Sequence, residues 1–247
     1  MMKKQVRGIF AAAAMVAAIG GVGTTIAYFT DTEKKTNVFT MGDLELGFRE
    51  PEWDTAPETG LPDGQNMYPG YTVYKNPTIK NITSDKNGAE PCYVRIRVKI
   101  TDQTGKLIEN EEALKLVHKM IYFDKTYNGT YESKGQAEKI VEGRIPGYSL
   151  LELSGYPMVN PLFTKDETRS SSNSLVYNYV GTKKDGKLQI GEEATLFTNV
   201  VVPIDWNQTE IKLIGDMKLE IEAESIQCSG FATPEDAFKA LDEELKK

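Results

Sequence analysis

Few side chains in this sequence could carry out catalytic or metal chemistry. His118 is the only histidine, and it stands on a predicted helix beside Lys119. A zinc peptidase needs histidine or carboxylate ligands at fixed spacing, commonly H-E-x-x-H, and a serine hydrolase needs a histidine to serve its nucleophile. Neither pattern occurs, and no loop has the alternating aspartates of a calcium loop. We therefore expect no catalytic residue, no metal site and no cofactor, with His118 as a structural residue.

The two cysteines, Cys92 and Cys228, allow two interpretations. Cys92 is in phase with Val94 on one predicted strand, and Cys228 is in phase with Ile226 on another, so both are expected to point inward. They are either two small buried thiols or a disulfide between core strands, which an oxidising extracellular environment permits. The sequence leaves both alternatives open.

The N-terminus has the features of a signal peptide. Lysine and arginine side chains come first, and an apolar run from Ile9 to Ile26 follows. Small residues at Thr25 and Ala27 match the pattern that a signal peptidase recognises. We expect residues 1–27 to be removed, with cleavage between Ala27 and Tyr28. The alternative is a retained membrane anchor, since the apolar run is near the length of a membrane span.

The charge of the chain excludes one class of partner. The formal net charge is −7, and removing the basic signal peptide makes the remainder more acidic. Nucleic-acid binding needs a basic face, so we expect no nucleic-acid partner. We also expect contact with a membrane only before cleavage.

Two stretches alternate strictly between apolar and polar residues, at Val94–Ile100 and Met217–Ala223. This period of two predicts strands with one face in the core and the other in water. The polar set of the first strand, Arg95, Arg97 and Lys99, is accordingly predicted to be solvated.

Other segments complete the predicted fold. Strands are expected at Phe39–Phe48 with a bulge at Gly42, at Tyr71–Ile82 and at Ala194–Pro203. A hairpin is expected at Leu175–Val180 and Lys187–Ile190, and a surface loop at 50–65. Helices are expected at Glu109–Met120 and 233–245. Thr233 can cap the last helix, and Pro234 fits its first position. Residues 122–174 give no clear pattern. We predict an all-β antiparallel sandwich with helical insertions and a short C-terminal helix, in a single domain of residues 28–247.

Several short motifs resemble the TasA/camelysin family. The first lie just after the predicted cleavage site, at Tyr28–Thr32 (YFTDT) and Asn37–Leu46 (NVFTMGDLEL). Later ones are Pro69-Gly70, Lys80–Thr83, Tyr93–Val98, Ala223–Gln227 and Thr233–Phe238. Members of this family are bacterial proteins exported with a dedicated signal peptidase, SipW. The resemblance implies a jelly-roll sandwich and a SipW-type peptidase as a partner.

The resemblance also implies a structural role outside the cell. Such a protein assembles into extracellular fibres or biofilm matrix as a head-to-tail homopolymer, in which the freed N-terminus donates a strand to the next copy. Here the donor is expected at Tyr28–Lys35, within a flexible segment of residues 28–37. Tyr28 and Phe29 are its expected apolar anchors, followed by Thr30 and Asp31.

Two alternative functions remain open from the sequence. The camelysin branch has been described as secreted or cell-surface metallopeptidases, although no metal-binding motif is present in this chain. The other alternative is a membrane-anchored accessory protein that nucleates fibres without forming them.

Overall fold

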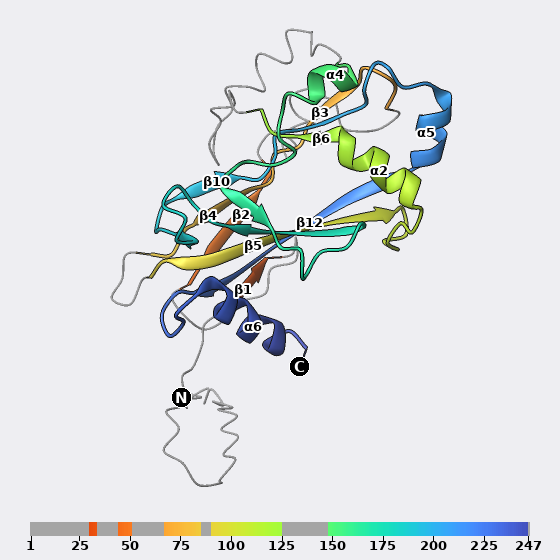
Figure 1. The fold of residues 1–247 in the computed structure, drawn as a ribbon. Coiled ribbons are helices and arrows are strands. Elements are labelled where there is room, and N and C mark those ends of the chain that lie inside the picture. The colour runs from red at the N-terminus through yellow and green to blue at the C-terminus, as the bar shows by residue number, and fades with distance from the viewer. Residues whose placement is uncertain (1–29, 34–43, 51–66, 85–89, 125–147, 247) are drawn as a thin grey trace, which may run out of the picture.

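A computed structural model describes residues 30–33, 44–50, 67–84, 90–124 and 148–246, and it consists mostly of antiparallel sheet (Figure 1). The largest sheet has six strands, in the order β1 (Thr30–Glu33), β12 (Met217–Gln227), β5 (Cys92–Asp102), β8 (Ser174–Tyr179) and β7 (Phe163–Lys165), with β9 (Lys187–Leu188) also paired to β5. The predicted all-β class is confirmed, while the jelly-roll connectivity stays a prediction.

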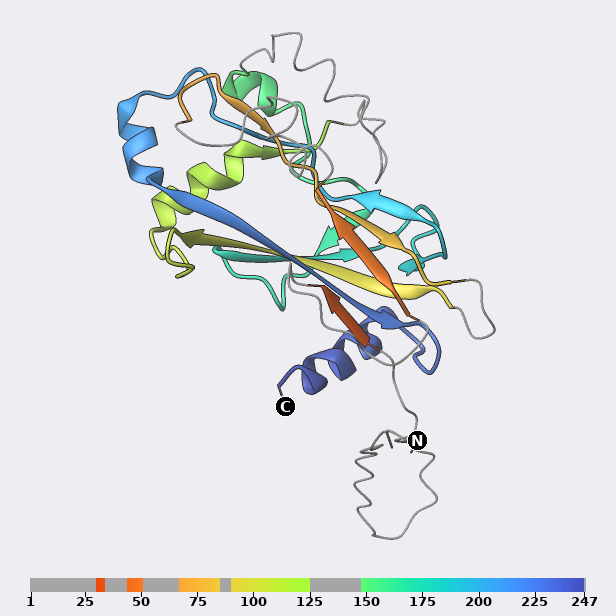
Figure 2. The same cartoon turned by 180° about the vertical axis from the view of Figure 1, so that it is seen from behind.

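Two smaller sheets have three strands each. One has the order β10 (Glu193–Thr195), β4 (Thr78–Asn81) and β2 (Leu46–Arg49). The other has the order β3 (Thr72–Tyr74), β11 (Asn199–Val201) and β6 (Ile121–Tyr122). Figure 2 shows the small sheets on one side of the large one, and their buried side chains share a hydrophobic core with β5 and β8.

The pair of long strands, β5 and β12, lies at the centre of the large sheet. They pair over eleven residues each, from Met217 opposite Asp102 to Gln227 opposite Cys92. The apolar set of β5 is buried as predicted, with exposed fractions of 0–1% at Val94, Ile96, Val98 and Ile100. The prediction of a solvated opposite face is wrong at Arg95, which is only 1% exposed.

Two of the long strands that the sequence predicts are each broken into two shorter strands, which belong to the two small sheets. The stretch at Tyr71–Ile82 forms β3 and β4, and the stretch at Ala194–Pro203 forms β10 and β11. Pro77, which has no N–H to donate to a ladder, lies in the first break. Leu196 in the second break donates its backbone N–H to the Pro77 carbonyl at 2.8 Å. The two segments therefore pass together from one small sheet to the other.

The predicted hairpin at Leu175–Ile190 does not form. Its two arms, β8 and β9, both pair with β5 rather than with each other. They lie one after the other along the same edge of β5, and residues 180–186 leave the sheet between them. The central strand β5 offers a long ladder to each arm, and this long-range pairing outweighs the local turn.

The helices lie outside the sheets, and their bounds are α2 (Glu111–Met120), α4 (Leu150–Leu153), α5 (Gln208–Ile214) and α6 (Pro234–Glu244). Asn110 caps α2 by accepting from the Glu112 and Ala113 N–H groups. In α6, the Thr233 side chain accepts from the Asp236 N–H as the sequence predicts. Figure 1 shows α6 on the large sheet near β1, and α4 at the other end of the molecule.

Several predicted features lie outside the described residues. These are the signal segment, the bulge at Gly42 and all but the first residue of the surface loop at 50–65. The described end of the first predicted strand, Leu46–Arg49, is β2 and pairs with β4.

Ile79 on β4 provides a test of the shared core, because its side chain is 0% exposed. Ile79→Ala should lower the free energy of unfolding by about 2–5 kcal/mol through lost burial and a residual cavity. Urea denaturation would measure this change. The matched control is Ile82→Ala, since Ile82 is 40% exposed and its truncation should cost less than about 0.5 kcal/mol. Equal losses for the two variants would contradict this placement of the core.

Candidate functional site

The N-terminal strand β1 forms one edge of the large sheet. It pairs with β12 in antiparallel register, from Thr30 opposite Ile226 to Glu33 opposite Ala223. The opposite edge of β12 is occupied by β5 along its whole length. In the part of the chain that the structure describes, this four-residue ladder is the strand pairing that holds β1. A short edge strand near a chain terminus is among the elements that separate most easily from a fold.

Among the strands that the structure describes, β1 is the one that pairs with the outer edge of β12, and its ladder ends at Ala223. Along Met217–Ile221, none of the described strands pairs with β12 on the side away from β5. In an antiparallel sheet, alternate residues of an edge strand direct their N–H and C=O groups outward. Such groups can accept an added extended segment, which is the basis of strand addition between proteins.

The side chains along this open edge are incompletely buried. Met217, Leu219 and Ile221 pack against the core, yet each is only partly buried. By contrast Ala223, which lies where β1 covers the edge, is 0% exposed. The neighbouring helix α5 contributes two partly buried isoleucines, and none of its residues is fully buried. The apolar layer is thus complete beside β1 and incomplete beyond it.

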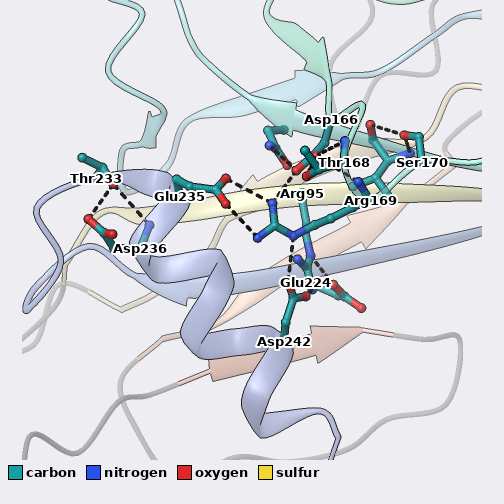
Figure 3. Close-up of polar contacts among 12 residues, drawn as sticks. Arg95, Asp166, Thr168, Arg169, Ser170, Glu224, Thr233, Glu235, Asp236 and Asp242 are labelled. Atoms are coloured by element: carbon teal, nitrogen blue, oxygen red, sulfur yellow. Dashed lines mark hydrogen bonds and ion pairs between the residues drawn. The ribbon is translucent and has the colours of Figure 1, made fainter.

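At the end of β12 that pairs with β1, the face of the sheet opposite the main core is covered by α6. Phe238 and Leu241 of α6 pack on Tyr93 of β5 and Ile226 of β12 in a separate hydrophobic cluster. A set of charged side chains, shown in Figure 3, joins the helix to the sheet. We call this set the helix clasp; it consists of Arg95, Asp166, Arg169, Glu224, Glu235 and Asp242.

Arg95 is the central residue of the helix clasp. Its Nε donates to the Glu224 carboxylate on β12, and its Nη2 lies 2.6 Å from Asp242 Oδ1 on α6. The guanidinium carbon is 5.3 Å from the centre of the Phe238 ring, within the range of a cation–π contact. A buried charge is tolerated only when it is paired and hydrogen-bonded, so these partners explain how an arginine occupies this position.

Arg169 ties the helix to the loop after β7. Its Nε lies 2.7 Å from Asp242, and its two terminal nitrogens each lie 3.1 Å from Glu235. Asp166 fixes the guanidinium from the other side at 2.7 Å. Although burial opposes it, hydrogen bonds from Thr168, Arg169 and Asn178 together with the Arg169 charge hold the pKa of Asp166 well below its usual range. Arg95 and Arg169 likewise lower the pKa of Asp242 against the effect of burial.

The sequence analysis missed the helix clasp because it assigned Arg95 to a solvated face. Alternation alone cannot tell a face in water from a face under a helix. The available signal was the C-terminal helix itself, because its apolar residues Phe238 and Leu241 require a sheet surface to cover. Leu245, which follows Phe238 and Leu241 at helical spacing, is instead 51% exposed.

The predicted donor and cleavage residues are only partly described. Ala27, Tyr28 and Phe29 lie outside the described residues, whereas Thr30 and Asp31 belong to β1. Within the described residues, no helix has the length and apolar character that crossing a membrane requires.

The two cysteines are free thiols, so the disulfide alternative is not what the structure contains. Cys92 lies fully buried in the main core, while Cys228 packs in the separate cluster under α6. Cys92 is the register partner of Gln227, so Cys228, one residue later on β12's extension, points to the opposite face of the sheet. Burial raises the pKa of Cys228 to about 12, which leaves an unreactive thiol.

His118 on α2 is half-buried, and its Nε2 lies 2.8 Å from the Ser172 carbonyl oxygen. Burial lowers the pKa of its imidazole, which favours the neutral ring. His118 also lines a shallow cavity of about 290 Å³ with Tyr122, Tyr156 and apolar side chains. Among the described residues, no three His, Cys, Asp or Glu side chains gather in a group that could hold a metal ion. That the chain is not an enzyme stays a prediction.

Comparison with known proteins supports the resemblance inferred from the motifs. The model of a family described as camelysin metallo-endopeptidase matches residues 1–91. This match supports the suspected resemblance to the TasA/camelysin family over that part of the chain. Comparison with curated proteins and with solved structures gives no match.

The depressed pKa values of Asp166 and Asp242 predict how the helix clasp responds to pH. Both carboxyls titrate below the usual aspartate value of 3.8 in the folded protein, so the unfolded chain takes up protons first as pH falls. Their stabilising contribution should be fully present above about pH 5 and decline as pH falls through and below the usual value. Urea titrations from pH 7 to pH 2.5 should show this decline. In Asp166→Asn it should be smaller, and an unchanged decline would contradict the assignment.

Proposed function

Because residues 1–91 match the camelysin family, we propose that this chain is a secreted structural protein that assembles into extracellular fibres or biofilm matrix. Copies join by exchange of the N-terminal strand, with Tyr28–Lys35 of one copy pairing with β12 of the next. In this proposal the fold is a jelly-roll sandwich, as the resemblance implies.

The observation that carries the proposal is the position of β1 on the free edge of β12. Among the described strands, Thr30–Glu33 pair with β12 alone, and β1 also lies close to β2. The same pairs can therefore form with β12 of a second copy, which is the condition for strand exchange at low energetic cost. The apolar anchors Tyr28 and Phe29 directly precede this strand in the sequence.

Strand exchange of this kind generates an open polymer. Donor and acceptor are different surfaces of the same chain, so each added copy presents a new acceptor edge. Along Met217–Ile221, none of the described strands pairs with the outer edge of β12, so a donor longer than the four residues of β1 would extend the ladder there. Its partly buried Met217, Leu219 and Ile221 would gain burial when such a strand is added.

The route to the cell exterior follows from the N-terminal sequence. Residues 1–27 serve as the signal peptide, a SipW-type peptidase cuts after Ala27, and the chain contacts the membrane only before this step. Cleavage releases Tyr28 as the new N-terminus and so frees the donor strand.

Strand exchange can be tested with two singly substituted chains. Asp31 and Ser225 are register partners in the β1–β12 ladder. When the Asp31→Cys chain is mixed with the Ser225→Cys chain, a disulfide between the new cysteines requires pairing between copies. We expect a covalent heterodimer on non-reducing electrophoresis of assembled protein that begins at Tyr28, together with fibres in electron micrographs.

The control pairs Asp31→Cys with Lys212→Cys, since Lys212 is exposed on α5 and is not in the register of β1. This mixture should give only background. A chain that carries both Asp31→Cys and Ser225→Cys can form the disulfide within one copy. If it does so while the mixture of single variants gives no heterodimer, β1 does not exchange between copies. Protein beginning at Tyr28 that never forms fibres would also contradict the proposal.

The processing step gives a separate prediction. Ala27→Asp places a charge where a signal peptidase requires a small residue, so the extracellular form beginning at Tyr28 should be lost. N-terminal sequencing of extracellular protein measures this, with Thr36→Asp as a control beyond the cleavage site. A wild-type protein retained with its first 27 residues would instead indicate the anchored accessory protein.

A further inference from the structure

The helix α6 and the strand β1 meet β12 at the same place. β1 pairs with the segment Ala223–Ile226. Within that segment, Glu224 is paired with Arg95 of the helix clasp, and Ile226 packs in the cluster under α6. The piece of β12 to which β1 attaches is therefore also the piece that α6 holds.

Among the described helices, none covers the rest of the same sheet face in this way. Lys99 pairs with Glu222 at 2.8 Å, and Thr101 donates to Glu220 at 3.2 Å. Both contacts are only partly buried, and none of the described helices packs over them in a hydrophobic cluster of its own. Among the described elements, the part of β12 that α6 covers is therefore the part that pairs with β1.

We propose that α6, fastened by the helix clasp, stabilises the attachment of β1 to β12 and so controls how readily the N-terminal strand leaves its own sheet. The inference rests on the strand pairing that the proposed function uses, and it adds a positioning role for Arg95 and Asp242. Opening the clasp weakens the β1 ladder without removing any residue of that ladder.

The physical reason is the environment of the ladder. Hydrogen bonds of an edge strand compete with water, and they persist longer where a packed helix excludes water from the neighbouring face. The clasp also fixes β12 itself, because Arg95 is bonded both to Glu224 on β12 and to Asp242 on α6. Without this tie, α6 is held less firmly over the stretch of β12 that pairs with Thr30–Glu33.

Asp242 is the residue to change, because it contacts both arginines. Asp242→Ala removes these contacts and places a strong helix former in α6, so the helix itself is not disfavoured. Arg95 keeps Glu224, and Arg169 keeps Asp166 and Glu235, which leaves each arginine paired. The matched control is Glu243→Ala, the adjacent exposed acid on the same helix.

The measurement is amide hydrogen exchange of the monomer, followed by mass spectrometry of peptides covering residues 28–35 and 220–228. In Asp242→Ala, exchange in both peptides should rise about tenfold or more, the factor expected from loss of charge-assisted hydrogen bonds. A peptide covering β4 should exchange at the wild-type rate, because its core lies on the other side of the sheet. Asp242→Glu, which retains the carboxylate, should partly restore protection.

The inference is overturned if residues 28–35 exchange their amide hydrogens at the same rate in Asp242→Ala and in Glu243→Ala. It is also overturned if exchange rises equally in the β4 peptide, since that result indicates general destabilisation. A failure of the proposed function can be told apart from a failure of this inference. The proposed function is tested by heterodimers of the cysteine variants and by fibres, whereas amide hydrogen exchange is measured on the monomer. If both hold, mixed chains carrying Asp242→Ala should form the heterodimer faster than chains carrying Glu243→Ala.

Discussion

The ladder between β5 and β12 is the constraint on which the rest of this structure depends. Eleven residues of each strand pair without interruption, and every other layer is placed by one face or edge of this pair. Val94, Ile96 and Val98 on one face meet the two small sheets, while Tyr93 and Ile226 on the other meet α6. The edges receive β8 and β9 on one side and β1 on the other.

The two halves of β12 differ in how many described strands and helices contact their edges and faces. Near its C-terminal end, β12 has a strand on both edges and a helix over its outer face. Near its N-terminal end, at Met217–Ile221, the described strands leave one edge open, and the apolar side chains are only partly buried. An unsatisfied strand edge is a liability for a protein that must stay monomeric. In a protein that polymerises through added strands, as we propose for this chain, the same edge is useful.

The helix clasp shows how a buried arginine can serve a specific role. Pairing Arg95 with Glu224 and Asp242 compensates for a desolvation cost that an apolar residue would not incur. The directional contacts of Arg95 with two carboxylates join α6 to β12, the strand that pairs with β1.

The elements that could be predicted from the sequence are those whose signals are local. Strict alternation fixed the strands around Val94 and Met217, and the Thr233-Pro234 cap located the last helix, because these signals depend on neighbouring residues alone. Only the tertiary structure decided which strands pair and which faces are covered. It split the strand at Pro77, separated β8 from β9 in favour of β5, and buried Arg95 under a helix from the far end of the chain. These outcomes depend on contacts between residues distant in sequence, and alternation reads the same whether the second face meets water or a helix.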